Sequence, residues 1–195
     1  MGRKDLSAVR RDQILDAFEQ CILEFGLFST TLTTVAEKAE MNRGQIHKYI
    51  GNRDALLSAL IERLIGSYRE DFSNYLEDQK ESPNPETILK YFFDEWGRVD
   101  SDDDAIFDAL VAESAFNSDL KEKVLVTYSM LEEGLAVVLH KMYPDTAPER
   151  CQNVAYAIIS MAYGSSTMTW LGFNRTRIPE IRVLAKTLIQ TLQED

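Results

Sequence analysis

A short polar stretch of the chain, residues 42–56 (NRGQIHKYIGNRDAL), gathers hydrogen-bond donors and positive charges, although the whole protein carries a formal net charge of −11. The guanidinium of Arg43 can form two hydrogen bonds with a guanine, and the amide of Gln45 can bond to the edge of another base. Lys48 and Arg53 supply positive charge for phosphate groups. These residue types, so close together, are typical of nucleic-acid binding.

The charge is distributed unevenly along the chain. Residues 1–53 hold eight Lys and Arg against seven Asp and Glu, a net charge of +1, whereas residues 54–195 hold thirteen against twenty-five, a net charge of −12. An acidic body repels nucleic acid, while a locally basic head can still bind it. The sequence therefore predicts two domains with different roles, at residues 1–52 and residues 53–195.

Helical periodicity runs through almost the whole chain, and no stretch shows the alternation of a strand. In the first long segment, apolar residues such as Ile14, Phe18 and Ile22 recur about every 3.6 residues until Gly26 supplies a stop. The same signals predict helices over residues 6–25, 31–39, 42–50, 53–76, 85–98, 103–116, 118–142, 148–172 and 179–193. The predicted fold class is therefore all-α, with about nine helices.

Two of the short helices have the spacing of a helix-turn-helix. Ala36 is small enough for a close helix crossing, a turn follows at Glu40, and Ile46 points back toward the core. The residues that point outward on a helical wheel are Gly44, Gln45, His47 and Lys48. A glycine on this face costs about 1 kcal/mol of helix propensity relative to alanine, which makes sense where the backbone must approach another molecule. The alternative is a solvated helical hairpin whose polar face has no partner, because this spacing is degenerate.

Residues 10–60 also carry a wider pattern. Its members are Arg11, Ile14, Leu15, Ala17, Gly26, Thr30, Thr31, Val35, Ala36, Gly44, Ile46, Gly51, Asn52, Arg53, Asp54 and Leu56. This pattern resembles the N-terminal DNA-binding domain of the tetracycline-repressor (TetR) family of transcriptional regulators. The departures from the usual family residues are Glu40 in place of Gly, His47 in place of Tyr, Ile50 in place of Phe and Arg53 in place of Lys. A non-glycine residue in the left-handed turn costs about 1 kcal/mol, so Glu40 is predicted to be modestly strained.

The resemblance implies a partner, double-stranded DNA with a palindromic operator, and a division of roles on this face. The residues that resemble base-reading positions are Arg43, Gly44 and Gln45, with Thr33 as an additional candidate. The residues that resemble contacts to the DNA backbone are Thr31, His47, Lys48, Tyr49 and Arg53. Thr31 begins a helix, where its hydroxyl and the free backbone N–H groups face an anion.

The resemblance further implies that the C-terminal helices form a homodimer. The helices at about 148–172 and 179–193 carry the stripes expected at the interface: Ala155, Ile158, Ile159, Ala162 and Ser166 on the first, and Leu184, Thr187, Leu188, Thr191 and Leu192 on the second. Either stripe could instead be buried within one subunit. Two amphipathic terminal helices with no further chain to cover them favour self-association.

A ligand pocket in the same C-terminal region is the last expectation from the resemblance. The predicted effector is a small, largely apolar molecule, because such pockets are mostly apolar with one or two polar groups. The residues expected to line the pocket are Trp96, Phe107, Glu113, Phe116, Tyr128, Met161 and Trp170. Aromatic residues at helical spacing also serve as ordinary core. Glu113 could be an acid at the edge of the core, or a carboxylate that meets a cationic or hydroxylated ligand.

Other classes of site and location fit the sequence less well. A Gly-rich phosphate loop, a nucleophile elbow and metal-ligand spacing are absent, so neither an enzyme nor a cofactor or metal site is predicted. Cys21 and Cys151 lie on separate apolar stripes and are expected to be reduced core thiols of a cytoplasmic protein. The charged N-terminus lacks a signal core, and no apolar run reaches the ~18 residues that a membrane span needs.

The predicted function is that of a homodimeric, ligand-responsive transcriptional regulator, and we expect it to be a repressor. The alternative is a helical adaptor that uses its acidic body to bind proteins and has no specific DNA binding. Salt-dependent binding to a DNA duplex separates the two, because an acidic adaptor would show none.

Overall fold

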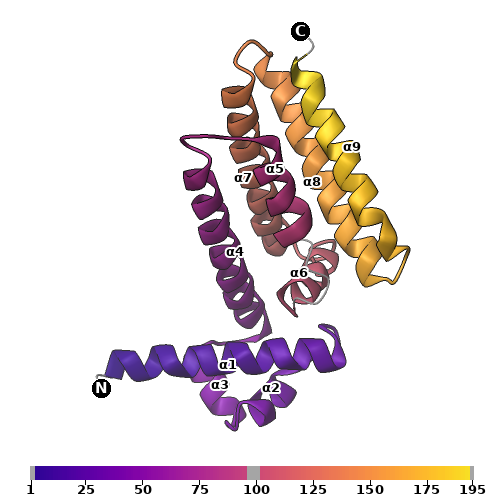
Figure 1. Ribbon diagram of the computed structural model, residues 1–195. Coiled ribbons are helices and arrows are strands. Elements are labelled where there is room, and N and C mark those ends of the chain that lie inside the picture. The colour runs from indigo at the N-terminus through magenta and orange to yellow at the C-terminus, as the bar shows by residue number, and fades with distance from the viewer. Residues whose placement is uncertain (1–2, 96–101, 194–195) are drawn as a thin grey trace. The chain divides into compact units, whose positions relative to one another are not determined.

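The computed structural model describes residues 3–95 and 102–193. Within these residues the protein consists of nine α-helices and no β-strand, which confirms the predicted all-α class (Figure 1). None of the helices in the described ranges has both the length and the apolar character needed to cross a membrane. The helices are α1 (Arg3–Phe25), α2 (Leu32–Lys38), α3 (Arg43–Tyr49), α4 (Arg53–Asp78), α5 (Pro85–Leu89), α6 (Asp102–Glu113), α7 (Ser118–Met142), α8 (Pro148–Trp170) and α9 (Ile178–Gln190).

The segment that begins at Pro85 departs from the single helix predicted over residues 85–98. The α-helical part, α5, ends at Leu89, and the chain continues as a π-helix, Lys90–Glu95. Apolar spacing does not reveal this change, because wide helical turns of this kind are rare and local. The last predicted residues, 96–98, lie outside the described part of the chain.

The chain folds into two compact units that interleave in sequence. The first comprises Met1–Ser67 and Asp102–Val124, and the second comprises Tyr68–Ser101 and Leu125–Asp195. Both α4 and α7 therefore contribute to both units. The boundary predicted after residue 52 separates a DNA-binding domain from a ligand-binding domain, which is a division by function, and it stays a prediction.

The first unit is built around α1. Ile14, Phe18 and Cys21 of this helix are at most 1% exposed, and α1 packs against α2, α3 and α6. From α3, Ile46 is fully buried. Burying an isoleucine side chain contributes roughly 1.5–3 kcal/mol. A seven-residue helix is marginal by itself in water, so α3 keeps its place because this side chain is buried.

The core of the second unit is aromatic where α4 meets the π-helix. The rings of Phe72 and Tyr75 are stacked with their centroids 5.6 Å apart, and those of Tyr75 and Tyr91 with their centroids 4.5 Å apart. α7 leaves room for Phe72 at Gly134, where a Cβ atom would lie 2.5 Å from the phenylalanine ring. Any side chain at this position must therefore displace the ring.

The apolar stripe predicted for dimerisation on α8 lies inside its own unit. Ala155 and Ile158 are fully buried, and Ile159 and Ala162 are 6% and 3% exposed. Helical periodicity identified the apolar side of α8 correctly, but the core of the same chain covers that side. The apolar side chains that are exposed on α8, on α9 and in the connection between them are Tyr156, Met168, Leu171, Phe173, Val183 and Leu184.

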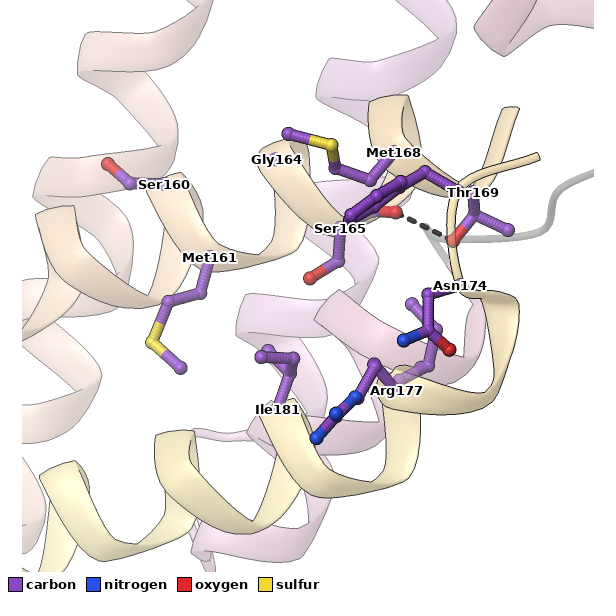
Figure 2. A pocket seen from close by; sticks show the side chains of 11 residues that line it. Ser160, Met161, Gly164, Ser165, Met168, Thr169, Asn174, Arg177 and Ile181 are labelled. Carbon is purple, nitrogen blue, oxygen red and sulfur yellow. Dashed lines mark hydrogen bonds between the residues drawn. The ribbon is translucent and has the colours of Figure 1, made fainter. Parts of the chain in front are cut away.

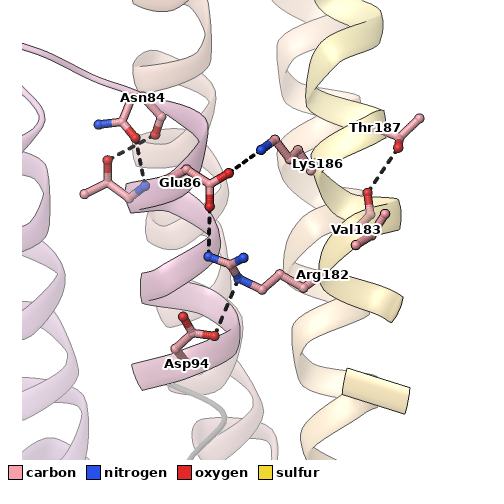
Figure 3. Close-up of polar contacts among 8 residues, drawn as sticks. Asn84, Glu86, Asp94, Arg182, Val183, Lys186 and Thr187 are labelled. Atoms are coloured by element: carbon pink, nitrogen blue, oxygen red, sulfur yellow. Dashed lines mark hydrogen bonds and ion pairs between the residues drawn. The ribbon is translucent and has the colours of Figure 1, made fainter. Parts of the chain in front are cut away.

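Ion pairs join α9 to α5 and the π-helix within the second unit (Figure 3). Arg182 donates a hydrogen bond of 3.0 Å to Glu86, which also pairs with Lys186. The Nε atom of Arg182 lies 3.6 Å from a carboxylate oxygen of Asp94. Figure 3 shows Val183 on another side of α9, directed away from these charges. The polar side of α9 is thus held by ion pairs within the second unit, while the side with Val183 stays exposed.

Each unit buries one cysteine. Cys21 of α1 and Cys151 of α8 are fully buried, and both carry free thiols. Burial raises the pKa of each thiol, because the apolar surroundings disfavour the charged thiolate. Both residues are core thiols, as the sequence predicts.

The turn between α2 and α3 contains the left-handed residue that the sequence predicts. Glu40 has a φ angle of 54°, in the region that favours glycine. Its N–H donates to the carbonyl oxygen of Glu37 at 3.1 Å, and the N–H of Met41 donates to that of Ala36 at 2.9 Å. These bonds close the end of α2, so the strain of Glu40 is the cost of ending the helix at this point.

Replacing Glu40 by glycine should raise the free energy of unfolding by about 0.5–1 kcal/mol, because relief of the left-handed strain exceeds the entropy that glycine adds to the unfolded chain. The matched control is Glu37→Gly, which places glycine in the right-handed helix α2 and should lower the same free energy by about 1 kcal/mol. Thermal and urea unfolding of both variants provide the measurement. Equal destabilisation by the two changes would contradict the role assigned to the turn.

Candidate DNA-binding face

Both short helices of the helix-turn-helix begin with a capping box. At α2, the Oγ1 atom of Thr31 accepts a hydrogen bond of 3.2 Å from the N–H of Thr34, and the N–H of Thr31 donates to Oγ1 of Thr34 at 2.9 Å. At α3, the Oδ1 atom of Asn42 accepts from the N–H of Gln45, and the N–H of Asn42 donates to Oε1 of Gln45, both at 2.9 Å. Each box satisfies backbone donors that a helix start otherwise leaves free, so the helix ends are fixed.

α3 exposes one side and buries the other. Ile46 is fully buried and Tyr49 is half-buried, while Arg43, His47 and Lys48 are exposed. Residues three and four positions apart lie on the same side of a helix. The side chains that the helical wheel directs outward therefore share one exposed face, together with Gly44.

Gly44 and Gln45 are tied to the cap of α3. A Cβ atom at Gly44 would lie 3.2 Å from Oδ1 of Asn42, which is closer than ordinary contact. The glycine thus keeps the cap uncrowded as well as leaving the exposed face flat. Gln45 is half-buried because its amide oxygen serves the cap. Its amide nitrogen still has two hydrogens to donate, and its oxygen has a second lone pair.

The positively charged residues near α3 divide into free and engaged groups. Lys48 is exposed, and its Nζ atom lies 5.2 Å from the centroid of the Tyr49 ring. Arg11, in contrast, donates a hydrogen bond of 3.1 Å to the carbonyl oxygen of Tyr49 and so fastens the end of α3 to α1. Arg43 has no acidic partner among the residues that the structure describes.

Arg53, at the first position of α4, is engaged on two sides. Its Nη2 atom donates a hydrogen bond of 3.1 Å to the carbonyl oxygen of Leu27, and its Nη1 atom lies 3.8 Å from Oε1 of Glu113. The side chain of Arg53 is 36% exposed, so it remains partly open to solvent. The guanidinium of Arg53, which the sequence predicts to contact a DNA phosphate, is therefore already in contact with Leu27 and Glu113 of its own chain.

The remaining predicted residues of this face lie on α2 and α3. Thr31 and Thr33 are exposed at the start of α2, and His47 is exposed on α3. Lys38, at the end of α2, forms an ion pair of 2.6 Å with Glu24 of α1. All nine residues predicted to contact DNA thus belong to the first unit and to α2, α3, the N-cap of α2 or the start of α4.

The residues predicted to line an effector pocket do not share one environment. In the first unit, Phe107 is 6% exposed in the core, whereas Phe116 is 84% exposed beyond the end of α6. Glu113, also in the first unit, is paired with Arg53. The second unit holds Tyr128 and Met161, both half-buried. Trp96 and the side chain of Trp170 lie outside the described part of the structure.

A groove of about 330 Å³ opens between the end of α8 and the start of α9 (Figure 2). Met161 lines it, as do residues outside the predicted pocket set: Ser160, Gly164, Ser165, Met168, Thr169, Phe173, Asn174, Arg177, Ile178 and Ile181. In the sequence, the only indication of this groove is the pair of apolar segments on either side of residues 171–177. The spacing of residues 171–177 is that of an ordinary loop and does not show that the chain folds back on α8.

Known proteins resemble this chain in part of its sequence and in its fold. No family model matches the chain. Over 83 residues, 43% of this chain, the sequence is 32% identical to the HTH-type transcriptional regulator BetI of Stenotrophomonas maltophilia (strain R551-3), and the match covers 42% of that protein. The chain thus spans about two fifths of the length of this curated relative.

Solved structures are similar over nearly the whole chain. A TetR transcription regulator from Haloarcula marismortui ATCC 43049 has a TM-score of 0.77 and 14% identity, with 94% of this chain and 98% of that one covered. A TetR-like transcriptional regulator from Rhodococcus sp. RHA1 has a TM-score of 0.65 and 20% identity, with 97% and 96% covered. The chain therefore has the fold of the TetR family of transcriptional regulators, which confirms the resemblance found in its sequence.

Proposed function

We propose that this protein is a homodimeric, ligand-responsive transcriptional regulator that binds a palindromic DNA operator through α3. The observation that carries the proposal is the face of α3, which exposes Arg43 and Lys48 while Ile46 holds the helix in the core. The recognition helix of a helix-turn-helix enters the major groove with its N-terminal residues against the base edges. Arg43 and Gln45, near the start of α3, suit that role, because both can donate hydrogen bonds to bases.

The DNA backbone would be held by groups around this helix. Lys48 and the partly exposed Arg53 supply positive charge, and His47 can donate a hydrogen bond. Thr31 and Tyr49 complete the proposed contacts to the backbone, and Thr33 is an additional candidate for a base contact. Contacts of this type set the register of a protein on a duplex but carry little sequence information.

A second copy of the chain would cover the exposed apolar residues of α8, α9 and the connection between them. Tyr156, Leu171, Phe173 and Val183 are each between 63% and 67% exposed, which is unusual for such large apolar side chains. The groove beside Met161 lies among them and would be filled by the partner. A two-fold pairing has the symmetry of a palindrome, whose half-sites must lie about one helical turn, roughly 34–36 Å, apart to be read by two copies of α3.

Ligand response is supported by polar atoms buried in the second unit. The hydroxyl of Tyr75 and the side-chain oxygen of Gln79 make no hydrogen bond within the described chain, although these residues are only 7% and 2% exposed. Leaving such groups unsatisfied costs about 1–3 kcal/mol each, so a ligand with matching polar groups would bind there favourably. Burial also raises the pKa of Tyr75, which keeps its hydroxyl protonated.

Regulation would follow as a shift between two arrangements of the chain. An effector that binds one arrangement better must lower the affinity for DNA by the same factor by which DNA lowers the affinity for the effector. The proposed effector is small and largely apolar, because aromatic side chains pack around Tyr75. In the proposed repressor, the DNA-bound form blocks transcription, and loss of DNA binding in the presence of the effector relieves that block.

Two kinds of substitution on α3 should separate base reading from phosphate binding. Lys48→Ala should weaken binding to all duplexes alike and reduce the dependence of log affinity on log salt concentration by about one unit. Arg43→Ala or Gln45→Ala should cost about 1–3 kcal/mol on the selected operator and much less on random DNA. Fluorescence anisotropy over a range of salt concentrations measures both effects.

The control is Lys121→Ala, which removes an exposed lysine of α7 in the same unit and should leave DNA binding unchanged. Identical behaviour of the Lys48 and Arg43 variants would contradict the separate roles. If no duplex binds at any salt concentration, the helical adaptor becomes the better account of the acidic chain.

Leu184→Glu should convert the dimer into monomers, because it places a charge in an apolar surface that the partner would desolvate. Leu184 is 57% exposed, so the monomer of this variant should fold normally. A charge at Leu188 would instead destabilise the fold, because Leu188 packs against the core of its own chain. The matched control is Val137→Glu, at an apolar residue of α7 that is 68% exposed. Light scattering that shows a dimer for Leu184→Glu would place the interface on another surface.

A further inference from the structure

The guanidinium of Arg53 connects three segments of the first unit. Arg53 belongs to α4, its hydrogen-bond acceptor Leu27 follows α1, and its ionic partner Glu113 is the last residue of α6. Nη2 and Nη1 are the two atoms engaged, one by the carbonyl oxygen and one by the carboxylate. These two nitrogens form one edge of the fork with which arginine binds a phosphate through two parallel hydrogen bonds. That edge is directed at the protein.

Glu113 depends on this arginine. Its side chain is only 13% exposed, and its Oε2 atom is buried without a hydrogen-bond donor among the described residues. A largely buried carboxylate that loses its positive partner is strongly destabilised. Arg53 therefore cannot turn fully toward another anion unless Glu113 gains solvent or moves away.

We propose that Glu113 competes with a DNA phosphate for Arg53, so that the position of the last turn of α6 sets how tightly the protein holds DNA. This inference rests on the proposed function, because it needs Arg53 to meet the duplex. A phosphate in contact with Arg53 would also lie within the screening length of about 8–10 Å from the Glu113 carboxylate, so the two negative charges repel each other.

Movement of α6 would pass to Glu113 through the core. Ile106 and Leu110 of this helix are at most 1% exposed, and α6 packs on α1. Packed helices shift between discrete arrangements rather than deforming continuously. An effector that holds α6 in the arrangement seen here keeps Arg53 paired with Glu113. One that draws the end of α6 away releases the guanidinium to the duplex.

The opposite role is also testable, since a carboxylate can orient an arginine for its ligand. In that case removing the charge of Glu113 would weaken DNA binding. The geometry favours competition, because the ion pair and the hydrogen bond to Leu27 occupy the Nη1–Nη2 edge of the guanidinium, and a phosphate that binds this edge must displace them.

The experiment measures duplex affinity of Glu113→Gln, using a duplex that the wild-type protein selects from a random-sequence pool. The affinity should rise about two- to five-fold, the range expected for loss of one partly exposed ion pair. The dependence of log affinity on log salt concentration should steepen by up to about one unit, because one more cation meets the phosphates. Circular dichroism and the melting temperature check that the variant is folded, and Glu113→Ala provides a second replacement.

The matched control is Glu62→Gln. Glu62 belongs to α4 in the same unit and forms an ion pair of 2.7 Å with Lys123, so the change removes the same charge and one ion pair away from Arg53. It should alter the affinity for the duplex much less than Glu113→Gln. Equal increases from the two variants would show that net charge alone is responsible, and the proposal would be overturned.

A double-mutant cycle tests whether Glu113 acts through Arg53. Arg53→Gln should weaken binding, and adding Glu113→Gln to that variant should raise the affinity much less than Glu113→Gln does in the wild-type protein, because only the direct repulsion between Glu113 and the phosphate is then removed. An equally large gain without Arg53, or weaker binding by Glu113→Gln alone, overturns the competition. If the wild type binds duplex and Glu113→Gln binds equally well, only this inference fails. If the wild type binds no duplex, the proposed function fails with it.

Discussion

The candidate DNA-binding face depends on the burial of Ile46 against the core of the first unit. α2 and α3 are seven residues each, too short to be stable helices on their own. Their capping boxes fix where they begin, but only the buried side chains fix how they are rotated. If Ile46 turned away from the core, the exposed face of α3 would turn with it. The hydrogen-bond donors of that face are aimed by an apolar contact on the other side of the helix.

The charges of the N-terminal region are less available than their number suggests. Arg11 and Arg53 both donate to backbone carbonyl oxygens, and Lys38 is paired with an acid. These arginines link neighbouring segments of the chain, because the planar guanidinium can donate a hydrogen bond to a backbone carbonyl oxygen and still carry its charge. Counting basic residues in the sequence directed attention to this region. Such a count could not distinguish the basic side chains that form contacts within the first unit from those that face solvent, such as Lys48.

Local signals predicted the helix-turn-helix closely, whereas long-range ones were less informative. The caps at Thr31 and Asn42 and the left-handed turn at Glu40 follow from neighbouring residues, and the structure shows all three. The same kind of reasoning could not tell whether the apolar side of α8 is covered by its own chain or by a second copy, because periodicity describes one helix only. Phe107 and Phe116 look alike in sequence, yet one is buried and the other is exposed, since α6 ends between them.

The two buried cysteines give each unit its own chemical reporter. A thiol reacts with an alkylating reagent as the thiolate and only when it is reached by solvent, so a fully buried thiol reacts when its surroundings open. Cys21 lies in the first unit and Cys151 in the second. The labelling rates of the two residues, compared in one sample, therefore report the opening of each unit separately. The sequence itself thus allows the cooperativity between the units to be measured without introducing any foreign probe.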